Sequence, residues 1–303
     1  MRRREALKDI ALGGLVLGLG REAAGRTRSG AAPQAKAGPD LAVATGESPA
    51  ALVRGAVDAL GGMKAFVGRG DKVVIKPNIG WDRTPEMAAC TNPEVVAALV
   101  ALVLEAGAKE AVVMDNTTNQ AKRCYVRSGI AEAARQAGAK VLFTDDYRLK
   151  KTALQGAWLK DWEVFADFLE ADTIINVPIA KVHSLSRLSM GMKNWLGAIG
   201  GARNQLHQKL DEAMVDLAAF FKPALTVLDA YRILVKNGPQ GGRPSDTQLV
   251  KTVVAGRDPV AVDAYGATLF DIRPEELPYL RIARERGLGR HELGELTIDK
   301  RTV

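Results

Sequence analysis

Cysteine and histidine are scarce in this 303-residue chain, which has two cysteines and three histidines. The cysteines are Cys90 and Cys124, and no Cys-x-x-Cys pair occurs anywhere. An iron–sulfur cluster normally takes four thiolates, so we do not expect this chain alone to hold one. The sequence leaves three roles open for the two cysteines: inert packing, a disulfide, or metal and redox chemistry.

Long hydrophobic runs and a strong charge on the body of the chain are also lacking. The apolar run at residues 10–20 is too short to cross a bilayer comfortably. The formal net charge is +7, but residues 1–37 hold eight basic and three acidic residues, which leaves only +2 for the rest. Binding of nucleic acid by a broad basic face is therefore not expected.

The first 37 residues have the order of parts of an export signal. Residues 3–8 resemble a twin-arginine motif, with Ala6 where a large apolar residue is usual, and residues 35–37 offer a small-x-small cleavage site. We predict a signal peptide at 1–37, recognition by the twin-arginine translocation machinery, a periplasmic or otherwise exported protein, and no stable membrane span after cleavage. An uncleaved anchor or a chance basic leader stays open. Because such proteins cross the membrane folded, export favours a bound metal or cofactor.

The rest of the chain alternates between short apolar strands and helices. A composition of 47% hydrophobic and 25% charged residues is that of a globular protein. This rhythm predicts a single α/β domain over 38–303, with a mostly parallel sheet, helices on both faces and βαβ units. The expected strands are 73–76, 111–114, 141–143, 173–177, 224–228 and 250–255, and the expected helices are 93–106, 130–137 and 259–270.

Polar side chains follow several of these strands. Lys76 and Asn78 follow the first, Asp115 the second, and Asp229 a later one. Parallel α/β sheets bind ligands outside the carboxyl ends of their strands, so we expect these side chains to surround a site. A lysine that ends an apolar strand has a buried stem and a head at the rim. The alternative is that loops and helix caps are polar without any further role.

The densest group of candidate residues lies between positions 176 and 207. His183 follows Lys181 by two residues on an expected strand end, so both side chains should lie on one face. Lys193 and Asn194 come shortly after, and His207 precedes a helical pattern. We expect these distant segments to converge.

The charges of these residues indicate the kind of ligand. Three lysines would repel a bare divalent cation in a crevice of low dielectric constant, and they would attract a phosphate or carboxylate. We therefore predict an anionic small molecule or cofactor as ligand. A divalent metal bridged by carboxylates, and catalysis on the ligand, both stay open. The predicted catalytic residues are His183 and Lys181, and the predicted ligand-binding residues are Lys76, Asn78, Lys193, Asn194, Asp229 and Asp115.

Seven short motifs stand out, at 74–78, 91–94, 176–178, 181–183, 193–197, 223–229 and 255–263. Together they resemble the domain of unknown function 362 family. The resemblance covers roughly residues 40–290, and its motifs occur in the family's order. Many members append a ferredoxin-like module with four cysteines, which this sequence does not show, so the resemblance does not imply iron–sulfur electron transfer here.

A second hypothesis is a non-catalytic metallocofactor carrier or maturation partner of a periplasmic redox system. Two sulfur and two nitrogen ligands would suit zinc, copper or iron. The residues that could supply them are Cys90, Cys124, His183 and His207.

Overall fold

The structure is a computed structural model that describes residues 38–303. The predicted signal peptide, residues 1–37, lies outside the described residues. No helix within 38–303 is long and apolar enough to cross a membrane.

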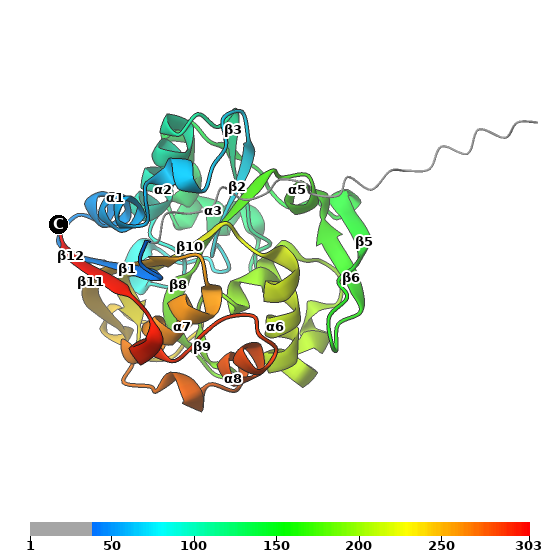
Figure 1. Ribbon diagram of the computed structural model, residues 1–303. Coiled ribbons are helices and arrows are strands. Elements are labelled where there is room, and N and C mark those ends of the chain that lie inside the picture. The colour runs from blue at the N-terminus through cyan, green and yellow to red at the C-terminus, as the bar shows by residue number, and fades with distance from the viewer. Residues whose placement is uncertain (1–37) are drawn as a thin grey trace, which may run out of the picture. The chain divides into compact units, whose positions relative to one another are not determined.

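A ten-stranded sheet forms the centre of the described part of the chain (Figure 1). Its main path runs in the order β12-β1-β11-β10-β7-β2-β3-β4, and β8 and β9 extend it beside β10. Most neighbouring strands are parallel, whereas β11 runs antiparallel to both β1 and β10. The strands are β1 (Leu41–Thr45), β2 (Lys72–Pro77), β3 (Glu110–Val113), β4 (Lys140–Val141), β7 (Thr173–Val177), β8 (Ile179–His183), β9 (Arg187–Ser189), β10 (Leu225–Leu234), β11 (Thr247–Gly256) and β12 (Ile298–Thr302).

Helices connect these strands, and a separate antiparallel pair, β5 (Leu149–Ala153) and β6 (Asp161–Phe165), lies outside the main sheet. Three helices begin at side-chain caps: Ser48 accepts from the backbone N–H of Ala51, Asn92 accepts from that of Glu94, and Asp258 accepts from two backbone N–H groups. The helices are α1 (Pro49–Ala59), α2 (Pro93–Glu105), α3 (Ala121–Arg127), α4 (Ile130–Gln136), α5 (Ala166–Leu169), α6 (Leu210–Phe221), α7 (Pro259–Thr268) and α8 (Pro278–Glu285).

Alternation along the strands creates an apolar layer on each face of the sheet. In β2, Val73 and Ile75 belong to the cluster that includes α1, α2 and α4, whereas Val74 belongs to the cluster that includes α6, α7 and α8. The helices accordingly cover both faces (Figure 1). The predicted α/β class, with a mostly parallel sheet and helices on both faces, is confirmed.

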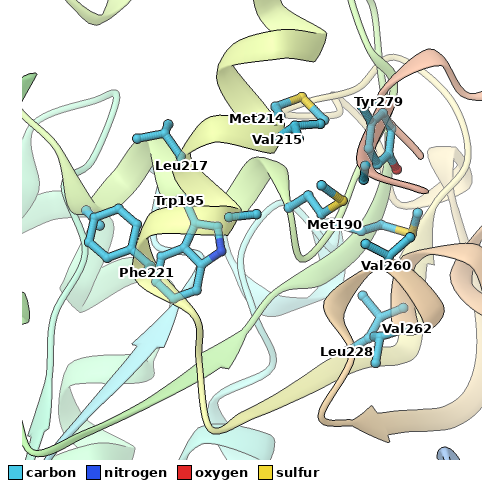
Figure 2. Close-up of a cluster of buried hydrophobic side chains, with 14 of the residues drawn as sticks. Met190, Trp195, Met214, Val215, Leu217, Phe221, Leu228, Val260, Val262 and Tyr279 are labelled. Atoms are coloured by element: carbon cyan, nitrogen blue, oxygen red, sulfur yellow. The ribbon is translucent and has the colours of Figure 1, made fainter. Parts of the chain in front are cut away.

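The apolar cluster that includes α6, α7 and α8 also holds the segment that follows β9, because side chains of this segment pack into it. Figure 2 shows Trp195 beside Phe221 and Leu217 of α6, and Met190 between α6 and α7. The rings of Trp195 and Phe221 stack with 4.7 Å between centroids, and Trp195 is fully buried. This packing fixes the short 3-10 helix η4 (Lys193–Ala198), which begins with Lys193, one of the three lysines of the predicted site.

Strand lengths determine which polar residues reach the same edge. The strands β2 and β3 end close to their polar residues, as the sequence predicts, whereas Lys181 and His183, expected just beyond the strand at 173–177, lie within the next strand, β8. The expectation for Asp229 was wrong, because β10 continues to Leu234 and leaves Asp229 in the middle of the strand.

Candidate functional site: a cationic pocket at the carboxyl edge

A pocket of about 200 Å³ opens where the chain leaves β2, β3 and β8, and η4 and a second 3-10 helix, η5 (Arg203–Lys209), complete its wall. The structure therefore brings together segments that are far apart in the sequence. The ionisable residues that line the pocket are Asp115, Lys181, His183, Lys193, Arg203 and His207.

Lys193 has a free ammonium group in this pocket. Within residues 38–303, no hydrogen bond or salt bridge to its Nζ atom is found, although the side chain is half-buried. Burial, together with the nearby charges of Lys181 and Arg203, lowers the pKa of Lys193 to about 8. An anion placed beside Nζ would relieve this unfavourable environment.

Lys181 is the second lysine of the pocket, and it is held more firmly. Its Nζ atom donates to Oδ1 of Asn78 at 3.0 Å and to the carbonyl of Ala89 at 2.5 Å. Both acceptors are neutral, so the charge has no carboxylate partner among them. Burial lowers the pKa of Lys181 to about 8. An ammonium group has three donors, so one remains for a ligand.

Lys76 does not line the pocket but pairs with Asp115 behind its wall. Its Nζ atom lies 2.6 Å from Oδ1 of Asp115, and both side chains are buried. Burial lowers the pKa of Lys76 and raises that of Asp115, and their mutual attraction opposes both shifts. Oδ2 of Asp115 accepts from the backbone N–H of Ile79 at 2.6 Å. Whatever the position of the proton, this pair carries no net charge.

The backbone at Gly197 packs directly against the ion pair of Lys76 and Asp115. A Cβ atom at this position would lie 1.9 Å from Oδ1 of Asp115 and 2.8 Å from Nζ of Lys76. The glycine of the 193–197 motif is therefore required by packing. Its carbonyl also accepts from the backbone N–H of Asn116 at 2.8 Å.

Three asparagines connect the lysines to the sheet. Asn78 donates to Oδ1 of Asn194 at 3.2 Å, and Asn194 donates to Oδ1 of Asn176 at 2.8 Å. Asn176 in turn donates to the carbonyl of Gly191 at 2.9 Å. Asn194 is buried and its amide is fully used, so its direct role is to position its neighbours. Asn78 lines the pocket and orients Lys181.

His183 lines the pocket, and the backbone occupies one of its two ring nitrogens. Its Nδ1 atom accepts from the backbone N–H groups of Leu185 at 3.1 Å and Ser186 at 3.4 Å. Burial, with Lys193, Lys181 and His207 nearby, lowers the pKa of His183 to about 3, so the ring is neutral at physiological pH. A neutral ring that accepts at Nδ1 carries its proton on Nε2. The hydrogen bonds thus assign His183 as a donor toward a ligand.

Arg203 closes the far side of the pocket. Its guanidinium donates to the carbonyls of Asn116, Thr117 and Leu196 at 3.0–3.1 Å. These bonds fix the loop after β3 against η4 without neutralising the charge. His207 lies on the same helix and is exposed, with Nδ1 3.2 Å from the carbonyl of Asn204.

Besides Lys76, which was predicted to bind the ligand but does not line the pocket, three of the predicted site residues lie elsewhere. Asp229 and Cys90 line a separate cavity of about 220 Å³, where Asp229 accepts from the backbone N–H groups of Asn92 at 2.7 Å and Tyr231 at 3.0 Å. Burial raises the pKa of Asp229 to about 6. Cys90 and Cys124 are free and buried.

The residues of the second hypothesis are not assembled into one site. His183 and His207 line the pocket, whereas neither cysteine does. Among the described residues, no group of three or more histidine, cysteine or acidic side chains is placed to hold a metal ion. The two-sulfur, two-nitrogen arrangement is therefore not formed in this part of the chain.

Arg203, Asn116 and Asn176 are not among the residues that the sequence predicted as ligand-binding, although all three fall in the segments that it singled out. Arg203 lies in a 3-10 helix outside the strand pattern, so the rule that ligands bind at strand ends does not point to it. Asn176 occurs within a buried strand, and an amide in that setting is a signal that could have identified it.

Comparison with known proteins identifies the family. The model described as "Domain of unknown function (DUF362)" matches residues 73–268. The chain belongs to this family. It is also similar to a thylakoid-associated protein of Synechocystis sp., with 27% identity over 246 residues that cover 78% of this chain and 75% of the relative.

Among solved structures, the fold is similar to that of the lactate racemase apoprotein from Thermoanaerobacterium thermosaccharolyticum. The TM-score is 0.47 and the sequence identity is 12%. The match covers 78% of this chain and 57% of that chain, so this chain spans a little more than half of that protein.

Proposed function

We propose that this DUF362 protein binds a small anionic molecule, bearing a carboxylate or a phosphate, in the pocket at the carboxyl edge of its sheet. The observation that carries the proposal is an imbalance of charge. Lys181, Lys193 and Arg203 line the pocket, and Asp115, the acidic residue among the lining residues, is already neutralised by Lys76. An anion would supply the missing negative charge.

Each lining group has a distinct role in this proposal. The Nζ atom of Lys193, which has no partner within residues 38–303, contacts the anion directly, and the third donor of Lys181 does the same. The Nε2–H group of His183 donates to an oxygen of the ligand. Arg203 adds charge while holding the surrounding loops.

A metal bridging the anion to the protein receives less support from this geometry. Asp115 is the carboxylate that would ligate it, and both of its oxygens already accept hydrogen bonds, from Lys76 and from the backbone of Ile79. Metal binding at Asp115 would have to break the buried ion pair. We therefore propose direct binding of the anion.

We also propose export through the twin-arginine pathway, because charged, apolar and small residues follow one another in residues 1–37 as they do in an export signal. Replacing both Arg3 and Arg4 with lysine should keep the protein in the cytoplasm. Fractionation of cells that express the two forms would test this, and equal export of both forms would contradict it.

Isothermal titration with inorganic phosphate and with pyruvate tests the binding proposal. Lys193→Met should weaken binding at least tenfold, because a charge-assisted hydrogen bond contributes about 1.5–3 kcal/mol. Lys64→Met is the matched control, since Lys64 is exposed and does not line the pocket. Equal affinity of wild type and Lys193→Met, or no binding of either anion to wild type, would contradict the proposal.

A further inference from the structure

We propose that the ligand is a small 2-oxo acid and that Lys193 forms an imine with its carbonyl carbon. This inference rests on the proposed anion-binding function and adds a substrate class and a covalent step to it. Three features of the pocket support it: the free amine, the donors placed around it, and the size of the cavity.

Lys193 is the lysine of this site that is available as a nucleophile. The Nζ atom of Lys76 is held by Asp115, and that of Lys181 by Asn78 and Ala89. Lys193 has no such partner among the described residues. With a pKa of about 8, roughly a tenth of its side chains are neutral at pH 7 and carry a free electron pair.

The neighbouring donors suit the two oxygen-bearing groups of a 2-oxo acid. The Nε2–H group of His183 is neutral and can donate to the carbonyl oxygen, which gains negative charge as the amine attacks. The remaining donor of Lys181 and the charge of Arg203 would hold the carboxylate. His183 is thus assigned as a donor, since its Nδ1 atom is already occupied by the backbone of Leu185.

The cavity limits the size of the ligand. Pockets for drug-sized molecules span about 300–1,000 Å³. This one, at about 200 Å³, fits an acid of two to four carbons more closely. Glyoxylate and pyruvate are the simplest members of the class.

The step balances without any further reactant. The electron pair of the neutral amine forms the N–C bond, and the π pair of the carbonyl moves to oxygen. Both amine protons end on that oxygen, which leaves as water and gives the imine. Protonation of the imine by solvent restores a cation beside the carboxylate.

Reductive trapping tests the inference. Wild-type protein would be incubated with pyruvate and cyanoborohydride, and the modified lysines would be identified by peptide mass spectrometry. We expect the adduct chiefly at Lys193, with at least tenfold lower labelling of the exposed Lys64. Lactate, which has a hydroxyl group in place of the ketone of pyruvate, should give no adduct. His183→Gln should still bind pyruvate but form the adduct more slowly.

The outcomes separate this inference from the proposed function. If titration shows that pyruvate binds but Lys193 is labelled no more than Lys64, the imine is ruled out and anion binding stands. If neither pyruvate nor phosphate binds, the proposed function fails and the inference fails with it. Adduct formation at Lys181 in place of Lys193 would also overturn the assignment.

Discussion

Two lysines beside the same pocket, the buried Lys76 behind its closed wall and the half-buried Lys193 on its open wall, are held in opposite ways. On the closed wall, Lys76 is paired with Asp115 at 2.6 Å and sealed by Gly197. On the open wall, Lys193 has no partner among the described residues and faces the cavity. Removing charge from water is costly in both places, but only the first lysine is compensated within the fold. The difference indicates that the closed wall serves stability and the open wall serves binding.

The largest expected effect is the loss of stability when Lys76, on the closed wall, is replaced. Lys76→Met leaves the buried carboxylate of Asp115 without its counterion, and breaking such a pair costs about 3–5 kcal/mol. Urea denaturation would measure the free energy of unfolding. The control is Arg54→Met, which breaks an exposed pair with Glu105 and should cost about 0–1 kcal/mol. Equal losses in the two variants would contradict the comparison.

The corresponding substitution on the open wall, Lys193→Met, should not lower the free energy of unfolding. Lys193→Met removes a desolvated charge that has no partner within residues 38–303 and keeps most of the side-chain volume. We expect the free energy of unfolding to stay the same or to rise by about 1–2 kcal/mol. A loss as large as that of Lys76→Met would show that Lys193 is structural.

The affinity for pyruvate should decrease as pH rises through about 8. Lys181 and Lys193 both have a pKa near 8 in the folded protein, so each loses its positive charge in this range. Above it, the affinity should fall by up to about tenfold per pH unit for each lysine that must be protonated. Titration calorimetry between pH 6.5 and 9.5 would test this. If the affinity did not change with pH, binding would not depend on the charges of these two lysines, and the prediction would be wrong.

The last expected effect concerns His183 and the pH dependence of stability. Its pKa is lowered from the ordinary 6.5 to about 3 in the folded protein, so the unfolded chain takes up the proton first. This group therefore contributes a loss of stability as pH falls from 6.5 toward 3. His183→Gln should make thermal unfolding less sensitive to pH between 7 and 4.5. An identical pH dependence in wild type would contradict the assignment of a buried neutral ring.

Sequence reasoning predicts the fold and part of the site because strand periodicity and strand ends are local features. It predicted that Lys181, His183 and Lys193 converge, and in the structure all three line one pocket. It could not foresee that Lys76 is paired with Asp115, 39 positions away, because the choice of ion-pair partner depends on packing.

Two other placements depend on features that periodicity does not reveal. Asp229 is displaced from the pocket because β10 is ten residues long, and strand length depends on pairing with β11. The role of Arg203 depends on three backbone carbonyls from separate segments. Neither feature has a signature in the local pattern of residues.

The most direct test of the open wall is the pKa of Lys193, measured by NMR titration of its side chain with and without phosphate. The value should be near 8 in the free protein and should rise when the anion binds, because the negative charge stabilises the ammonium form. Lys193→Arg would identify the resonance. A value near 10.5 that phosphate does not change would contradict the proposal that this pocket is built around an uncompensated cation.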